Sequence, residues 1–249
     1  MSKVLVTETY LNNIGAAIRS KNGTANRYTP SQMANAISAI SEANWTSDGR
    51  MYLENMTFPS GTTAIGFSGD TWPTGRYYNI SGIQTVVIPD SVTAIYAGAF
   101  CDCRNLSNIT FGSGLLTIGN QAFRYTKITT LDLSSTQITS LGTAAFYGCR
   151  QLTTLSLPAT ITSINNDVNS ATFRDCFALK TVNLGNGFLC SINFQWSTQF
   201  TADDIVAMFN KLGNVPTGET RTFTLGATNL AKLTDAQKQI ATDKGWTLA

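Results

Sequence analysis

The chain contains five cysteines, and two of them, Cys101 and Cys103, are separated by a single residue. Closely spaced thiols are the residue type that binds soft metal ions or forms redox pairs. The chain has no histidine, which is the most common metal ligand, general base and member of catalytic triads. A lone Cys-x-Cys pair without histidine or a second pair is a weak metal signal, so we expect neither a metal ion nor a cofactor.

Other catalytic groups are equally scarce. The sequence has no Gly-rich phosphate loop and no Gly-x-Ser-x-Gly motif, which leaves only carboxylate chemistry. A glycosidase needs two carboxylates about 5–9.5 Å apart in a cleft. The neighbours Asp203 and Asp204 are explained by the start of a helix, and Asp132 is almost alone on its predicted surface. We therefore expect a protein that is not an enzyme.

The composition excludes some classes of binding partner. Hydrophobic residues make up 43% of the chain and charged residues only 13%, about half of the ~25% usual in soluble proteins. The net charge of +2 argues against nucleic acid or an anionic membrane as a partner. No apolar run has the length of a signal peptide or a membrane span, so no export signal is visible.

A repeat organises the middle of the chain. The dipeptide Ala-Phe recurs at equal intervals and returns as Thr-Phe after an interval four residues longer, at Phe100, Phe123, Phe146 and Phe173. A second apolar position keeps the shorter interval throughout, at Ile95, Ile118, Leu141 and Ile164. Between them runs a Leu-x-x-Leu-x-Leu pattern. Together these patterns predict an α/β repeat solenoid of about 23-residue coils with a stacked β-sheet, in which equivalent residues lie about 4.8 Å apart.

The repeat also explains the cysteines. Three residues after each repeated Phe stands a small side chain: Cys103, Thr126, Cys149 and Cys176. Because a free Cys behaves as a small hydrophobe, we expect these thiols to pack behind the Phe residues in the core. Cys149 and Cys176 lie in neighbouring coils and are close enough to pair, although stacked thiols are the preferred interpretation. Cys101 is outside this column and is expected to point away from the core.

The run IPDSVTAIYAGAFCDCRNLSNITF closely resembles the BspA-like, Treponema-type leucine-rich repeat family. The resemblance covers residues 81–194, with a weaker first unit at 56–65. Departures from the family pattern are Thr126 in place of Cys, Gly112 and Ser134 in place of Pro, and Thr172 before Phe173. The resemblance implies a surface adhesin or binding protein and does not imply catalysis.

The flanks carry a second resemblance. The segment LVTETYLNNIGAAIRSKNGTANRYTPSQMANAISAI and the ending FTADDIVAMFNKL…TDAQKQIATDKGWTLA are similar to segments of phage and prophage tail-associated proteins of Gram-positive hosts. This resemblance implies a location on a virion tail or an extracellular surface. It also implies that the N-terminal part docks on other virion or surface proteins.

The same flanks can be interpreted from their residues alone. Residues 1–45 predict a helical module with helices near 10–18 and 29–40, and the short helices need a partner chain, a trimer axis or the first coil to pack on. Docking module and simple cap therefore both stay open, as does a homo-oligomer, and residues 41–49 are expected to form a linker. Residues 46–80 predict an irregular first coil, 81–194 the solenoid, and 195–249 an α+β C-terminal cap. In the cap, Thr201 with Asp204 and Thr234 with Gln237 predict capping boxes around a strand at 222–225.

Two surfaces are candidates for binding. The outward residues of the predicted strands form small polar ladders, at Thr85, Asn108, Thr130, Thr154 and Thr181, and at Val87, Thr110, Asp132, Ser156 and Asn183. Such a flat polar face suits a glycan or a protein partner; the alternative is a solvated face without a ligand.

The second candidate is a break in the period. Phe173 arrives four residues late, which places an insertion at 165–172, with Asn165, Asn166, Asp167 and Asn169 as polar candidates. Aromatic and charged residues near the Phe positions are further candidates: Arg124, Tyr125, Tyr147, Arg174, Phe177 and Tyr96. Trp72, Tyr77 and Tyr78 form a candidate aromatic platform, although Trp72 equally suits a plug for the first coil.

Two functions fit these features. The first is a receptor-binding or adhesion protein on a phage or prophage tail, whose solenoid contacts protein or glycan on a host cell surface. The second is a bacterial cell-surface adhesin with the same repeats, which would require an export signal or wall anchor.

Overall fold

The computed structural model describes residues 44–45, 51–52, 55–66, 75 and 77–249. The chain divides into a unit Met1–Ser38 and a unit Ala39–Ala249, and the second is described here by itself. The predicted N-terminal helices and Trp72 lie outside the described residues. Asn44–Trp45 (β1), which we predicted to be linker, instead pairs antiparallel with Met51–Tyr52 (β2), because turn-forming residues between them suit a hairpin as well as a linker.

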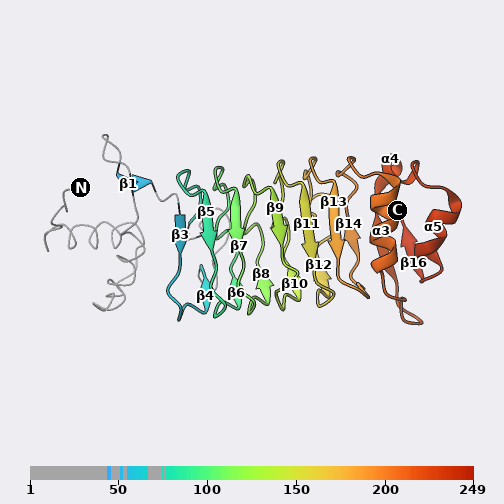
Figure 1. Cartoon of the computed structure of the whole chain (residues 1–249), viewed down its shortest axis with the longest axis horizontal. Coiled ribbons are helices and arrows are strands. Elements are labelled where there is room, and N and C mark those ends of the chain that lie inside the picture. Colours follow the sequence, from blue (N-terminus) through green and yellow to red (C-terminus); the bar gives the residue numbers. More distant parts are fainter. Residues whose placement is uncertain (1–43, 46–50, 53–54, 67–74, 76) are drawn as a thin grey trace, which may run out of the picture. The chain divides into compact units, whose positions relative to one another are not determined.

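Each coil of the solenoid contributes one longer strand and one two-residue strand (Figure 1). The longer strands are β3 (Asn55–Thr57), β5 (Thr85–Val87), β7 (Asn108–Thr110), β9 (Thr130–Asp132), β11 (Thr154–Leu157) and β13 (Thr181–Leu184). The short strands are β4 (Ala64–Ile65), β6 (Ala94–Ile95), β8 (Thr117–Ile118), β10 (Ser140–Leu141) and β12 (Ser163–Ile164). All of these pairings are parallel, which confirms the repeat fold and the weak first unit at 56–65.

The short strands form one continuous five-stranded sheet, but the longer strands form two sheets, β3-β5-β7 and β9-β11-β13. The break follows from the sequence. The strand residue Ile128 follows Phe123 by one residue fewer than the equivalent Leu106 follows Phe100. The shorter connection leaves β7 and β9 without a ladder of their own.

The core is a column of aromatic rings along the solenoid. The rings of Phe100, Phe123, Phe146 and Phe173 stack nearly parallel, with centroids 5.3, 5.4 and 5.8 Å apart in successive pairs. Tyr77, which we predicted to be part of a binding platform, instead stacks on Phe100 at 5.3 Å. It stands one repeat length before Phe100 and fills the Phe position of its coil.

The cysteines are core residues. Cys103, Cys149 and Cys176 are fully buried as predicted, and none of the described cysteines forms a disulfide. Our expectation for Cys101 was wrong, because its side chain is also fully buried. Cys101 follows the column Phe at a corner where the preceding coil covers it, with the Asn79 N–H donating to the Cys101 carbonyl.

The C-terminal cap closes the stack. β14 (Ile192–Asn193), β15 (Arg221–Thr224) and β16 (Trp246–Leu248) form a parallel sheet, accompanied by α3 (Ala202–Lys211), α4 (Gly226–Leu230) and α5 (Asp235–Thr242). Both predicted capping boxes are present, at the starts of α3 and α5. The helix α3 packs beside β13 (Figure 1), and so covers the last coil.

Candidate functional site

The outward strand residues form the predicted polar ladders, but each ladder is divided between the two sheets of longer strands. Thr85 pairs with Asn108, and Thr130 pairs with Thr154, while the step between β7 and β9 is unpaired. The second ladder of the same strands, with Thr110, Asp132 and Ser156, is exposed or half-buried. Its polar groups are satisfied locally: the Asp132 carboxylate accepts from Ser134 at 2.6 Å, and Asn183 donates to Ser156 at 3.2 Å. This face is small, polar and self-contained.

The insertion forms a closed loop at the end of β12. Its two ends are joined by the Thr172 N–H, which donates to the Asn165 carbonyl at 2.9 Å. Inside the loop Asp167 accepts from the Asn169 N–H at 2.8 Å. Val168 at the tip is 56% exposed. The loop therefore presents an apolar tip to solvent.

Asn166 anchors the base of this loop. Its amide nitrogen donates to the carbonyls of Ser191 at 2.7 Å and Ile164 at 3.1 Å, bridging two coils. It lines a small polar cleft together with Ser191 and Arg221. The Arg221 guanidinium is already bonded to the Leu189 carbonyl and to Glu219. The side-chain oxygen of Asn166, by contrast, is buried without a hydrogen-bond partner among the described residues.

A cluster of arginine and aromatic side chains lies beside the loop. We call it the arginine–aromatic corner, and its members are Arg124, Tyr125, Tyr147, Arg174 and Trp196. All of them occupy the first or second position after a phenylalanine of the core column. The backbone at these positions is linked from coil to coil, for example from the Tyr125 N–H to the Tyr147 carbonyl at 2.9 Å. The corner is therefore a rigid part of the stack.

The guanidinium groups lie over the aromatic rings. Arg124 lies 4.7 Å from the Tyr125 ring centroid and 4.9 Å from that of Tyr147. Arg174 lies 5.6 Å from Tyr147 and 5.5 Å from Trp196. These distances are within the range of cation–π attraction. Cations and rings alternate along four successive coils and hold each other in place.

The backbone at the corner adopts the left-handed conformation. The second position after the column Phe has a positive φ in successive coils, 59° at Asp102, 60° at Tyr125, 70° at Gly148 and 61° at Asp175. Gly148 has a specific role, because a Cβ there would lie 2.3 Å from the Tyr125 ring. The missing side chain lets Tyr125 lie flat across the next coil, where it meets the edge of Tyr147 at 5.4 Å.

The two acidic residues of the corner are used internally. Asp102 is bonded to Arg104 at 2.6 Å. Asp175 lies 3.8 Å from the Arg174 Nε and accepts a hydrogen bond from the Tyr147 hydroxyl. Burial, followed by this hydrogen bond and the nearby carboxylate charge, raises the pKa of Tyr147.

The structure joins the insertion to this corner. Arg174 donates to the Val168 carbonyl in the loop at 2.8 Å while its guanidinium lies over Tyr147 and Trp196. Of the predicted candidates, Tyr125, Tyr147, Arg124 and Arg174 thus meet in one place with the loop, although they are half-buried rather than exposed. The polar ladders lie on the strands and are not part of this cluster.

Sequence reasoning missed two members of this region. Trp196 stands two residues after Phe194, whose ring continues the core column at 5.9 Å from Phe173. Recognising Phe194 as a column residue would have placed Trp196 in register with Tyr125. Arg104, four residues after Phe100, lies 5.5 Å from the Tyr125 ring. Arg150 stands at the same interval after Phe146, and this repeated position could have identified Arg104 as a candidate.

No group of described residues could hold a metal ion. Burial raises the pKa of the Cys103 and Cys149 thiols to about 12, which removes the thiolate that metal binding and redox chemistry require. Among the described helices none is long and apolar enough to cross a membrane.

Comparison with known families agrees with this geometry. Residues 71–199 match, in six copies, the family described as BspA type leucine rich repeat region. The chain belongs to the BspA-type leucine-rich repeat family. A comparison with curated protein sequences finds no match for this BspA-type protein.

The solved structure of a leucine-rich repeat protein from T. pallidum has the same fold. The leucine-rich repeat protein of T. pallidum is 20% identical, with a TM-score of 0.55 over 90% of this BspA-type chain and 98% of the T. pallidum chain. Leucine-rich repeat proteins of Eubacterium ventriosum and Bacteroides ovatus are 18% and 20% identical, with TM-scores of 0.46 and 0.43. They align with 71% and 59% of this chain, which spans 42% and 48% of theirs.

Proposed function

We propose that this protein is a non-enzymatic adhesion protein that binds protein or glycan on a cell surface through its solenoid. The observation that supports it is the joining of the arginine–aromatic corner to the insertion loop. Aromatic side chains with a polar handle, held rigidly beside arginine, are the groups most enriched at the centres of binding interfaces. The exposed Val168 at the tip of the loop adds apolar area beside them.

The corner is suited to binding because little has to be ordered when a partner arrives. A backbone hydrogen bond between coils already fixes Tyr147, and the Arg174 guanidinium lies over the rings of both Tyr147 and Trp196. Binding is tighter when contact groups are ordered beforehand, because the entropy of immobilising them has already been lost.

The proposed setting is the tail of a phage or prophage, with residues 1–45 docking on the particle. The resemblance of both flanks to tail-associated proteins supports it. The alternative is a bacterial cell-surface adhesin, which the membership in the BspA-type family supports equally. Antibody detection of the chain in purified particles distinguishes the two settings: its presence there favours the tail, and its presence only on cell envelopes favours the adhesin.

The binding function is tested with fluorescently labelled protein on candidate host cells. Deletion of 166–169 is a suitable variant, because it leaves four residues between Ile164 and Phe173, as between Leu141 and Phe146. A double variant, Tyr147→Ala with Trp196→Ala, removes the aromatic groups. The control is Leu116→Ala, an exposed apolar residue on the connection into β8.

We expect both test variants to lose most of the cell binding and the control to retain it, with circular dichroism unchanged in all three. Binding that survives in both test variants would contradict the placement of the contact at the corner. Failure of the intact protein to bind the envelope of any candidate host would contradict the function itself.

A further inference from the structure

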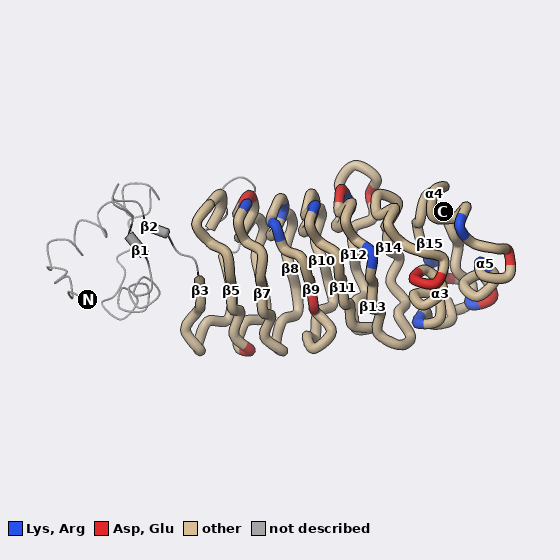
Figure 2. The backbone as a smooth tube through the Cα atoms, turned by 45° about the horizontal axis from the view of Figure 1, so that its top comes forward, with Lys and Arg blue, Asp and Glu red and all other residues tan. Residues whose placement is uncertain are grey.

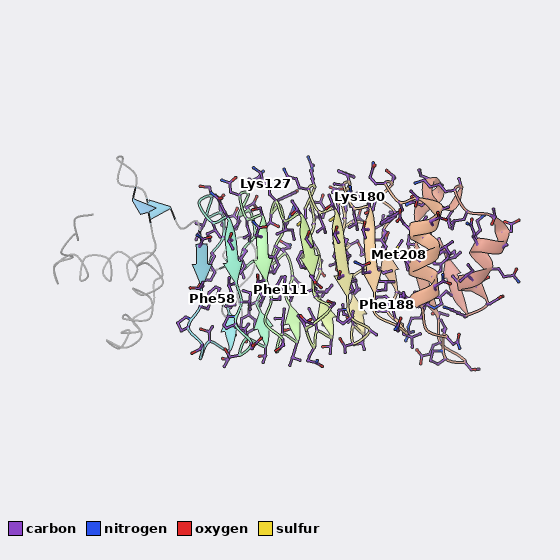
Figure 3. The ribbon with its side chains drawn as sticks, viewed as in Figure 1. Phe58, Phe111, Lys127, Lys180, Phe188 and Met208 are labelled. Carbon is purple, nitrogen blue, oxygen red and sulfur yellow. The ribbon has the colours of Figure 1, made fainter. Side chains whose placement is uncertain are left out.

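The basic residues of the repeats are confined to one edge of the solenoid. Between residues 81 and 194 every Lys and Arg lies after a column Phe and before the next longer strand, at Arg104, Arg124, Lys127, Arg150, Arg174 and Lys180. Figure 2 shows these positions gathered along one side of the tube, and Figure 3 places Lys127 and Lys180 on the edge opposite Phe111 and Phe188. The six basic residues on this edge outnumber its acidic residues, of which Asp102 and Asp175 lie close to Arg104 and Arg174.

Three exposed cations lie on successive coils of this edge. Arg104 and Arg150 occupy the same position, four residues after their column Phe, and each backbone N–H there donates to the carbonyl two residues before it. Lys127 lies closer to its strand, because its coil is one residue shorter, and its N–H donates to the Leu106 carbonyl of the preceding coil. We call these three residues the cationic column. The next coil continues the column with Phe177, which is 46% exposed and lies 5.9 Å from the Arg150 guanidinium.

The fold does not neutralise this column. Arg104 is paired with Asp102, but within the described part of the chain Lys127 and Arg150 make no ion pair. Lys127 donates only to the neutral Asn105 side chain at 3.2 Å. Like charges one coil apart repel each other, so the column lowers the stability of the isolated protein. An anionic partner would turn that repulsion into attraction.

We propose that the cationic column, with Phe177 at its end, binds a linear anionic polysaccharide that lies along the solenoid axis. This inference deepens the proposed adhesion function and rests on it. Exposed cations on successive coils suit a polymer that carries repeated sulfate or carboxylate groups. The exposed ring of Phe177 and the half-buried ring of Tyr125, which lies below Arg104, offer flat apolar faces for sugar rings.

The observations favour a glycan over a nucleic acid. A nucleic-acid interface usually requires a strongly basic domain with a pI above about 9, whereas this chain has a pI of about 8.3 and a net charge of +2. The column extends over only three coils.

The experiment measures fluorescence anisotropy of labelled heparin oligosaccharide, sulfate-free heparosan and single-stranded DNA at low salt. The test variant is Lys127→Gln with Arg150→Gln. The matched control, Lys211→Gln with Lys238→Gln, removes the same charge from exposed or half-buried cap positions. We expect about tenfold weaker glycan binding for the test variant, as for two lost surface ion contacts, a smaller loss for Phe177→Ala, and less than about twofold change for the control.

Binding of both glycans assigns the site to carboxylate or sulfate polymers, and binding of heparin alone assigns it to sulfate. The inference is overturned if neither glycan binds, if the test and control variants weaken binding equally, or if DNA binds as tightly as the glycans. Cell binding that persists without glycan binding would refute the inference alone. Glycan binding without cell binding would leave the column in place and refute the adhesion function.

Discussion

Replacement of Gly148 by alanine tests how the binding corner is built. Gly148 has φ +70°, and a Cβ there would lie 2.3 and 2.5 Å from two ring atoms of Tyr125. The left-handed backbone costs an alanine about 1–2 kcal/mol. The displaced Tyr125 ring also loses two cation–π contacts and one aromatic contact, each about 0.5–1 kcal/mol at a partly exposed site. We expect Gly148→Ala to lower the free energy of unfolding by about 2.5–5 kcal/mol in total.

The measurement is urea unfolding followed by circular dichroism and tryptophan fluorescence. In a Tyr125→Ala background the ring is absent, so Gly148→Ala should cost only the backbone part, about 1–2 kcal/mol. The difference between the backgrounds measures the coupling of ring and glycine. Ala144→Gly is the matched control, because Ala144 already has φ +53°, and relief of strain offsets the entropy of glycine there.

The reasoning would be refuted by a Gly148→Ala cost below about 0.5 kcal/mol, which is well under the left-handed penalty alone. An equal cost in both backgrounds would show that Tyr125 does not lie across Gly148. A large destabilisation by Ala144→Gly would show that the backbone at this corner is not strained as described.

Three further predictions concern the core and the cap. Phe146→Ala empties the space between two stacked rings and should lower the free energy of unfolding in urea by about 3–5 kcal/mol. Phe146→Leu should lower it clearly less, and equal losses for the two variants would contradict the stacking. The Cys149 thiol, whose pKa burial raises to about 12, should react with a disulfide reagent at pH 8 only after unfolding, and rapid reaction of the native protein would disprove its burial. Because the unfolded thiol ionises with a pKa of about 8.5, stability should decrease as pH rises above that value, since the unfolded chain then binds fewer protons. Lys244 donates to the carbonyls of Phe209, Asn210 and Leu212 at the end of α3, so Lys244→Met should cost about 1.5–3 kcal/mol, and an unchanged melting curve would contradict that role.

Much of the fold follows from local spacing. A constant period shared by three apolar positions can only be satisfied by coils that stack in register, because no single coil buries its own apolar face. The buried Phe column, the buried thiols of Cys103, Cys149 and Cys176, and both capping boxes in the C-terminal cap were therefore predictable. Each of these depends on residues whose partners repeat at a fixed interval or lie within one helical turn.

The features that the sequence did not predict all depend on contacts between coils. Tyr77 stands one repeat length before Phe100, but its flanking residues lack the Ala-Phe pattern, and only the stacked ring shows that it belongs to the core. Cys101 was predicted to point outward because it lies outside the column of small side chains, whereas its side chain is buried and the residue that follows it, Asp102, has a left-handed backbone. The interruption between β7 and β9 depends on one missing residue, whose effect on pairing is visible only in three dimensions.

The sequence by itself determined that the chain is a stack of BspA-type coils with a polar strand face and a loop insertion. Tertiary structure decided which side chains meet. The insertion touches Arg174, Arg174 lies over Tyr147 and Trp196, and Gly148 gives Tyr125 its place. These contacts join side chains of successive coils. They depend on the left-handed backbone conformation at the corners and on how each coil is placed on the next one, and neither can be derived from the period of the repeat.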